Sequence, residues 1–170
     1  MGKDSINILE IVEQTMADGP GLRTSIYCAG CGHHCPGCHN PQSWNPRNGH
    51  EVGIDDLMEL IKADEFSNVT FTGGDPLYQV EAFTELARRI KKETKKTIWC
   101  WTGFTIEEIR ASERLSMILP YLDVLVDGPF ILEKRDTQLH FRGSSNQRII
   151  YLTPKEDDTI PGTVPVIPYR

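Results

Sequence analysis

Four of the five cysteines fall within eleven residues, and this clustering constrains the chain more than any other feature of its sequence. The group comprises Cys28, Cys31, Cys35 and Cys38, whereas Cys100 stands alone. The first residues contain no apolar run of signal-peptide length, so we expect a cytoplasmic protein with reduced thiols. Reduced cysteines spaced this closely indicate a metal site.

The cysteine spacing can be divided in two ways, and each way implies a different centre. All four cysteines give C-x2-C-x3-C-x2-C, whereas Cys31, Cys35 and Cys38 alone give C-x3-C-x2-C. Zinc sites normally use two C-x2-C pairs separated by roughly a dozen residues or more, and three intervening residues are too few. An iron–sulfur cubane is larger, so closely spaced thiolates on one loop can each bind a different iron. The spacing therefore favours a [4Fe–4S] cluster.

A cubane held by only three cysteines leaves one iron without a protein ligand. Such an iron can coordinate a small molecule, by the logic that separates open catalytic metal sites from closed structural ones. A closed four-cysteine cluster, a zinc site and plain reduced thiols are the alternatives. We expect Cys28 and Cys100 to be thiols that bind no metal. For His33, His34 and His39 we favour exposure or hydrogen bonding within the loop over ligation.

Composition limits the remaining classes. Hydrophobic residues make up 39% of the 170 residues and charged residues 25%, which is typical of a globular protein. The length allows one domain but not a complete eight-fold α/β barrel, which needs about 200 residues or more. Eighteen basic against 24 acidic residues give a net charge of −6, which argues against a nucleic-acid partner. The longest uncharged stretch, 24–46, is too polar to cross a membrane.

Strand and helix patterns alternate along the chain. We expect strands over 6–12, 22–27, 68–72, 97–101, 123–127 and 148–152, and helices over 54–63, 79–93 and about 115–119, with another helix opening at the capping-box pattern of Thr105 and Glu108. This rhythm predicts an α/β fold with a mostly parallel sheet, in which ligands bind at the carboxyl ends of the strands. The cysteine loop follows an early strand. Residues 1–152 form the predicted domain, and 153–170 a proline-rich tail.

Further motifs occur at the ends of these expected elements, in a fixed order. They are Gly19-Pro20-Gly21-Leu22-Arg23, Cys38-His39-Asn40-Pro41-Gln42-Ser43-Trp44, Gly73-Gly74-Asp75-Pro76-Leu77, Asp127-Gly128-Pro129-Phe130, and the block from Arg142 to Arg148. Together with the C-x3-C-x2-C spacing, they resemble the activating proteins of anaerobic ribonucleoside-triphosphate reductase, a family of radical S-adenosylmethionine enzymes. The resemblance extends from about Ile6 to Leu152.

The resemblance implies a partial, incomplete α/β barrel and an oxidoreductase. In this family a reduced [4Fe–4S] cluster cleaves S-adenosylmethionine, bound at the open iron, into methionine and a 5′-deoxyadenosyl radical. The radical takes a hydrogen atom from a backbone glycine near the C-terminus of the large reductase subunit. The implied partners are that subunit and an electron donor such as a flavodoxin or ferredoxin.

The resemblance also implies roles for individual residues. Cys31, Cys35 and Cys38 would bind the cluster, Gly37, Gly73, Gly74, Asp75 and Asp127 the cofactor, and Arg23, Arg142 and Arg148 a carboxylate of the cofactor or the partner protein. Asp75 stands where many relatives carry the longer glutamate. Asp127 would orient the ribose or a monovalent cation, or else accept N–H bonds in its own turn.

Four other functions fit parts of the pattern. Two are short radical S-adenosylmethionine enzymes, namely a pyruvate formate-lyase-type activator and a relative of 7-carboxy-7-deazaguanine synthase. The third is a non-enzymatic electron carrier with a closed four-cysteine cluster, and the fourth is a zinc-binding interaction module.

Overall fold

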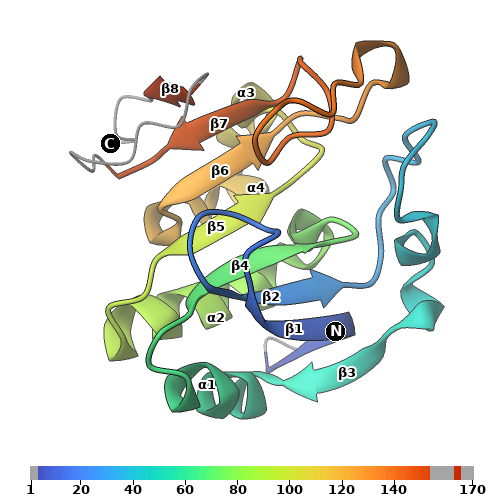
Figure 1. The fold of residues 1–170 in the computed structure, drawn as a ribbon. Coiled ribbons are helices and arrows are strands. Elements are labelled where there is room, and N and C mark those ends of the chain that lie inside the picture. Colours follow the sequence, from blue (N-terminus) through green and yellow to red (C-terminus); the bar gives the residue numbers. More distant parts are fainter. Residues whose placement is uncertain (1–3, 154–162, 166–170) are drawn as a thin grey trace.

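The computed structural model describes residues 4–153 and 163–165. Eight strands form one open sheet in the order β3-β1-β2-β4-β5-β6-β7-β8 (Figure 1). The strands are β1 (Ser5–Thr15), β2 (Arg23–Cys28), β3 (His50–Gly53), β4 (Asn68–Gly73), β5 (Ile98–Trp101), β6 (Val124–Asp127), β7 (Arg148–Tyr151) and β8 (Thr163–Pro165). The α/β fold with an incomplete barrel is therefore confirmed.

The four central strands run parallel and place their carboxyl ends at one edge of the sheet. β2 pairs with β4, β4 with β5, and β5 with β6, all in parallel. β1 and β3 extend the sheet antiparallel on one side, and β7 pairs antiparallel with β6 on the other. The cysteine loop leaves the end of β2 at this carboxyl edge, at the right in Figure 1.

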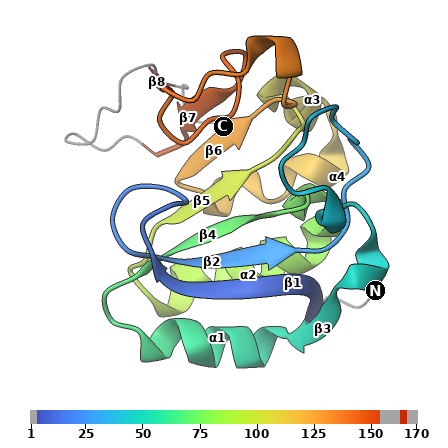
Figure 2. The same cartoon turned by 45° about the vertical axis from the view of Figure 1, so that its right-hand side comes forward.

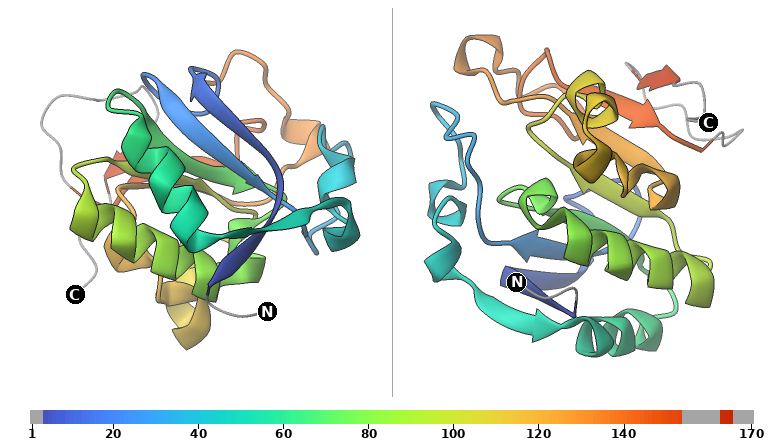
Figure 3. Two further views of the ribbon diagram at one scale, coloured as in Figure 1. Left: turned by 90° about the horizontal axis from the view of Figure 1, so that it is seen from below. Right: turned by 180° about the vertical axis from the view of Figure 1, so that it is seen from behind.

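Helices cover one face of the sheet, as the view from behind in Figure 3 shows. They are α1 (Ile54–Ala63), α2 (Val80–Glu93), α3 (Ile106–Ala111) and α4 (Glu113–Ser116). In α1 and α2 the apolar residues recur at helical spacing and lie buried against outward-facing residues of the strands, as Phe83 does against Phe71. Both side chains of the capping box at Thr105 and Glu108 make their bonds to backbone N–H groups, as predicted.

Loops rather than helices lie over the opposite face. Figure 2 shows the loop between β1 and β2 on this side, with the long segment between β6 and β7 above it. Beneath them is a second, smaller apolar cluster on β5, β6 and β7, with Trp99 at its centre and Trp101 and Phe141 at its margin. Trp101 Nε1 donates to the Phe141 carbonyl at 2.9 Å, which fixes the long segment to the sheet.

Some predicted elements differ from the structure. β3 was not predicted, because its sequence, His-Glu-Val-Gly, lacks strand alternation. The helix predicted to start at residue 79 is preceded by a 3-10 turn, Pro76–Gln79, and α2 starts at Val80. The helical piece predicted over 115–119 is wrong in its bounds, since α4 ends at Ser116 and a separate 3-10 turn spans Leu119–Tyr121.

Part of the predicted tail joins the sheet. β8 pairs in parallel with β7, so this short strand is an addition to the predicted architecture. The remainder of the predicted tail beyond residue 153 lies outside the described residues. Among the described residues, no helix has both the length and the apolar character needed to cross a membrane.

Candidate functional site

The cysteine loop is tied to the sheet at its base. Beyond β2, Ala29 N–H donates to the Asn7 carbonyl at 3.0 Å, and Gly30 N–H donates to the Ser43 carbonyl at 2.7 Å. The Gln79 side-chain amide donates to the carbonyls of both Asn7 and Ala29, at 3.0 and 3.1 Å. These bonds hold the two ends of the loop together, so that the residues between them project from the carboxyl edge.

Three of the thiols share one cavity. Cys31, Cys35 and Cys38 are half-buried and line a cavity of about 950 Å³, whereas Cys28 and Cys100 are fully buried in the core behind it. All five cysteines are free thiols. Among the described residues, no three His, Cys, Asp or Glu side chains form a group that could hold a single metal ion.

The environment of the thiols suits a cluster with several irons. A cubane needs several cysteines around one space and N–H groups near the sulfurs. Cys31, Cys35 and Cys38 line one cavity, and a backbone N–H group lies near one of their sulfurs. The Asn40 backbone N–H donates to Cys38 Sγ at 3.5 Å. Burial, as the largest cause, raises the pKa of Cys31 to about 11 in the metal-free protein. Metal binding must therefore displace a proton from this thiol.

A glycine turn borders the same cavity. Gly73 ends β4 with φ of +105°, and a Cβ atom built on it would lie 2.3 Å from the Cys28 backbone nitrogen. A Cβ on Gly74 would lie 2.4 Å from the Gly30 carbonyl oxygen. The Asn40 side-chain amide donates to the Gly73 carbonyl at 3.4 Å. The bare backbone of the turn therefore packs directly against the base of the cysteine loop.

Asp75 follows this turn and is almost fully buried. Its Oδ1 accepts a bond from Leu77 N–H at 2.9 Å, which caps the 3-10 turn. Its Oδ2 accepts from Thr102 Oγ1 and Gly103 N–H, both at 2.9 Å, and lies 2.7 Å from His33 Nε2. The carboxylate thus connects three segments, and any contact with a cofactor at this turn would come from the backbone.

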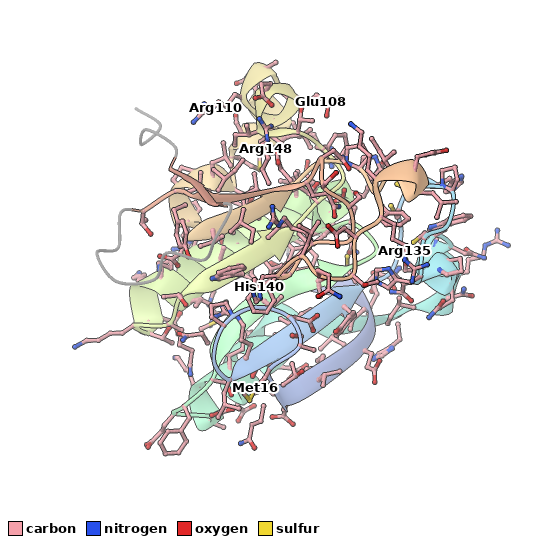
Figure 4. All side chains as sticks on the ribbon, turned by 45° about the horizontal axis from the view of Figure 1, so that its top comes forward. Met16, Glu108, Arg110, Arg135, His140 and Arg148 are labelled. Atoms are coloured by element: carbon pink, nitrogen blue, oxygen red, sulfur yellow. The ribbon has the colours of Figure 1, made fainter. Side chains whose placement is uncertain are left out.

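The rest of the cavity is formed by both loops on the helix-free face. Its wall near the cysteines includes Thr72, Thr102, Gly103 and Gly128. Residues from the long β6–β7 segment include Phe130, Phe141, Arg142, Gly143 and Gln147, and those from β1, β2 and their connection include Leu9, Glu10, Val12, Ala17, Asp18 and Tyr27. Figure 4 shows Met16 and His140, one on each of the two loops, on the side that faces the viewer.

Gly37 and Asp127 were also predicted to bind the cofactor, but unlike Gly73 and Gly74 they do not line the cavity. A Cβ on Gly37 would lie 2.8 Å from Leu132 Cδ1, so Gly37 packs against the β6–β7 segment. Asp127 is fully buried and accepts bonds from Ile106 N–H at 2.7 Å and from Arg148. Its carboxylate is directed at the start of α3 rather than into the cavity.

Arg148, a predicted partner-binding residue, joins three elements. Its Nε and Nη2 donate to the two oxygens of Asp127 at 3.0 and 2.6 Å, and its Nη1 and Nη2 donate to Glu107 at 3.0 and 2.7 Å. The bonds from Arg148 are the largest cause that lowers the pKa of Glu107 to about 2, so Glu107 stays ionised at neutral pH. Figure 4 shows Arg148 below α3, the helix that carries Glu108 and Arg110.

Replacing Arg148 with Met is expected to destabilise the fold. Among the residues that the structure describes, the change leaves the buried Asp127 carboxylate with the Ile106 N–H as its one donor, and breaking a buried pair typically costs about 3–5 kcal/mol. Because the Arg148 side chain is 36% exposed, we expect about 2–4 kcal/mol in the free energy of unfolding. Urea denaturation of the cluster-free protein measures this. Arg142→Met is the control, and equal midpoints for the two variants would contradict the assignment.

The other two predicted partner-binding arginines have opposite positions. Arg23 is 1% exposed and donates to Thr70 Oγ1 and the Val69 carbonyl, both at 2.7 Å. Its guanidinium also lies 5.7 Å from the centre of the Trp99 ring. This position leaves Arg23 no surface to offer a partner. Arg142, by contrast, lines the cavity, and its one described bond is to the His140 carbonyl at 3.3 Å.

Sequence reasoning did not find two features of the site. Tyr27 donates a hydrogen bond to Asp18, and burial together with this carboxylate raises the pKa of the tyrosine well above its usual range. Asp18 precedes the Gly19 motif, but strand periodicity gives no sign that Tyr27 faces a cavity. The second feature is the hydrogen bond between His33 and Asp75, because His33 was expected to be exposed or to bond within its own loop.

Comparisons with known proteins agree with the iron–sulfur interpretation. Residues 17–150 match the family described as 4Fe-4S single cluster domain. A protein of Vibrio cholerae serotype O1 is 38% identical over 143 residues, which cover 79% of this chain and 90% of the relative. The Haemophilus influenzae relative is 38% identical over 154 residues, covering 85% and 97%. The Escherichia coli K12 relative is 35% identical over 148 residues, covering 81% and 93%. All three are named anaerobic ribonucleoside-triphosphate reductase-activating protein.

Proposed function

Since the chain belongs to the 4Fe-4S single cluster domain family and to the anaerobic ribonucleoside-triphosphate reductase-activating proteins, we propose that it generates the glycyl radical of such a reductase. The observation that carries the proposal is the cavity shared by Cys31, Cys35 and Cys38 and the Gly73–Gly74 turn. A cluster and a second ligand bound there would lie side by side at the carboxyl edge of the sheet.

Three thiolates, from Cys31, Cys35 and Cys38, would hold a [4Fe–4S] cluster and leave one iron open. When bound and reduced, the cluster would supply one electron to split S-adenosylmethionine into methionine and a 5′-deoxyadenosyl radical, which would remove a hydrogen atom from a reductase glycine to give 5′-deoxyadenosine. Cys28 takes no part, because it is buried in the core behind the cavity. A flavodoxin or ferredoxin is the proposed electron donor.

The glycine turn would bind the methionyl end of S-adenosylmethionine through its backbone. Gly73 and Gly74 line the cavity beside the thiols, and neither has a side chain to keep a ligand away. The Asp75 and Asp127 carboxylates are occupied by protein donors, so their contribution would be to hold the β4 turn and the end of β6 in place. Gly37 would contribute indirectly, because its left-handed backbone shapes the cysteine loop.

The reductase glycine would enter from the helix-free face. The sheet is open between β3 and β8, and this face carries loops instead of a helical layer. A primary-carbon radical reacts with almost any nearby C–H bond, so the site must exclude water and stray side chains while admitting one peptide backbone. Phe130, Phe141 and Arg142 of the β6–β7 segment line this route and are the proposed contacts for the partner.

Electron paramagnetic resonance tests the open iron. The protein is reconstituted with iron and sulfide without oxygen, reduced, and measured with and without S-adenosylmethionine. We expect the signal of the reduced cluster to change when S-adenosylmethionine is added, because a ligand to one iron alters the electronic structure of the cluster. An unchanged spectrum would contradict the proposal and favour a closed cluster that only carries electrons.

A further inference from the structure

We propose that His33 is a positioning residue, which holds the cysteine loop at a fixed distance from the glycine turn through its bond to Asp75. The inference rests on the proposed function, because it concerns how the cluster and S-adenosylmethionine are held relative to each other. His33 lies between two of the proposed cluster ligands, Cys31 and Cys35, and its Nε2 lies 2.7 Å from Asp75 Oδ2. This bond joins a side chain of the 31–38 segment to Asp75, the residue that follows the glycine turn.

The His33 ring is enclosed on several sides. It packs edge-on against Phe104, with ring centres 4.6 Å apart, and against Tyr78 at 5.5 Å. A Cβ atom added to Gly103 would lie 2.6 Å from His33 Cδ2 and 2.7 Å from its Nε2, so the ring fits closely over the bare backbone of Gly103. The side chain is only 17% exposed although it belongs to a projecting loop. Such enclosure gives the ring one orientation.

Asp75 is held in place by other residues, so its bond to His33 fixes the position of the histidine. Its carboxylate is 1% exposed and is fixed by the Thr102 hydroxyl, Gly103 N–H and Leu77 N–H. A buried carboxylate with these three donors cannot follow a histidine that moves, so the ring must come to it. The same residue directly follows Gly74. One carboxylate therefore joins the cysteine loop, the glycine turn and the end of β5.

The neighbouring histidine lacks these features and offers a matched comparison. His34 stacks on Trp44, with ring centres 4.7 Å apart, and both residues belong to the cysteine loop. Its described contacts therefore join the loop to itself, whereas those of His33 join the loop to other elements. Two adjacent histidines thus separate stabilisation of the loop from its attachment to the glycine turn.

Loss of the His33 bond should leave the thiols intact and loosen their placement. Cys31, Cys35 and Cys38 keep their spacing in a His33→Leu variant, so a cluster can still assemble. Mutating residues that support a metal site from outside its ligand set typically lowers metal affinity or activity by about 10- to 100-fold. We therefore expect His33→Leu to assemble its cluster but to bind S-adenosylmethionine about 10- to 100-fold more weakly. His33→Gln places an amide near the position of Nε2 and should restore most of the affinity.

The first measurement is hydrogen exchange in the cluster-free protein. His33→Leu is expected to raise exchange across residues 31–38 and 73–78, whereas His34→Leu should raise it within 31–44 only. Gly103→Ala gives an independent test, because its methyl group displaces the His33 ring without altering the histidine. If His33→Leu does not fold, Gly103→Ala and His33→Gln still test the bond. Unchanged exchange at 73–78 in His33→Leu and Gly103→Ala would overturn the proposal.

The second measurement is the iron content and the binding of S-adenosylmethionine to the reconstituted variants. A positioning role is supported if His33→Leu has a normal iron content but binds S-adenosylmethionine more weakly. His33→Gln should recover most of this binding, and His34→Leu should bind as the unaltered protein does. Loss of iron in His33→Leu would overturn it in favour of a role in holding the cluster itself. If the unaltered protein fails to bind S-adenosylmethionine, the proposed function fails, whereas the exchange experiment still reports on the His33 bond.

Discussion

Replacing any one of Cys31, Cys35 and Cys38 by Ala is expected to reduce cluster-bound iron to background and to abolish reductase activation. Each thiol lines the same cavity, so each would bind a different iron, and no other cysteine reaches this space among the described residues. With only two thiolates, two irons of the cubane would lack a protein ligand, so we expect the cluster to be lost. The measurements are iron and sulfide content after anaerobic reconstitution, and formation of the glycyl radical on the purified reductase.

The matched controls are Cys28→Ala and Cys100→Ala. Both residues are fully buried in the core, and neither lines the cavity that Cys31, Cys35 and Cys38 share. We expect both variants to keep their iron and to lose about 1 kcal/mol in the free energy of unfolding. Iron loss in Cys28→Ala would contradict the three-cysteine assignment and indicate a closed cluster.

The variants of the three half-buried thiols also separate the loss of activity from the loss of stability. Cys31, Cys35 and Cys38 are half-buried on a loop whose base is held by backbone bonds and by Gln79. Their removal should leave the unfolding free energy of the cluster-free protein within about 0.5 kcal/mol of the unaltered chain. Activity lost without stability lost is the expected pattern.

Most of the sheet and its helices could be predicted because their sequences have a clear period. α1 was predicted with its observed bounds, since its buried residues recur at helical spacing. The strands β4, β5 and β6 were predicted within about one residue at each end, because each is a short apolar run closed by glycine or polar residues. β3 could not be found, because only its pairing with β1 makes it a strand.

The site was predictable where it depends on spacing and unpredictable where it depends on packing. The three thiols were proposed from their spacing and the glycine turn from its resemblance to a family motif, and the fold brings both to one cavity. The position of Arg23 could not be anticipated, because arginine is almost never fully buried unless it is paired. Its burial follows from Thr70 and the Val69 carbonyl, which lie 47 and 46 residues away.

Replacing Gly73 with Ala is expected to lower the free energy of unfolding strongly. The added Cβ would lie 2.3 Å from the Cys28 nitrogen and 2.6 Å from the Tyr27 carbonyl carbon, both backbone atoms of β2. Backbone cannot move aside as a flexible side chain can, so β2 and β4 must separate locally. Left-handed backbone at φ of +105° adds strain, and together these effects should cost about 2–5 kcal/mol in the free energy of unfolding.

Gly21→Ala separates the two causes. Gly21 also has positive φ, of +70°, but a Cβ there has open space within 4 Å, so this variant should show the backbone strain alone, about 1–2 kcal/mol. Gly74→Ala has the opposite combination, with a Cβ 2.4 Å from the Gly30 carbonyl oxygen and no left-handed backbone.

The clash at the turn, rather than strain in general, should decide S-adenosylmethionine binding. Because the turn packs against the start of the cysteine loop, we expect Gly73→Ala and Gly74→Ala to lose the spectral change caused by S-adenosylmethionine, and Gly21→Ala to keep it. Urea denaturation and electron paramagnetic resonance on the same three proteins provide both readouts. If Gly74→Ala bound S-adenosylmethionine as the unaltered protein does, close packing of the bare backbone at residues 73–74 would not be what forms the cofactor site.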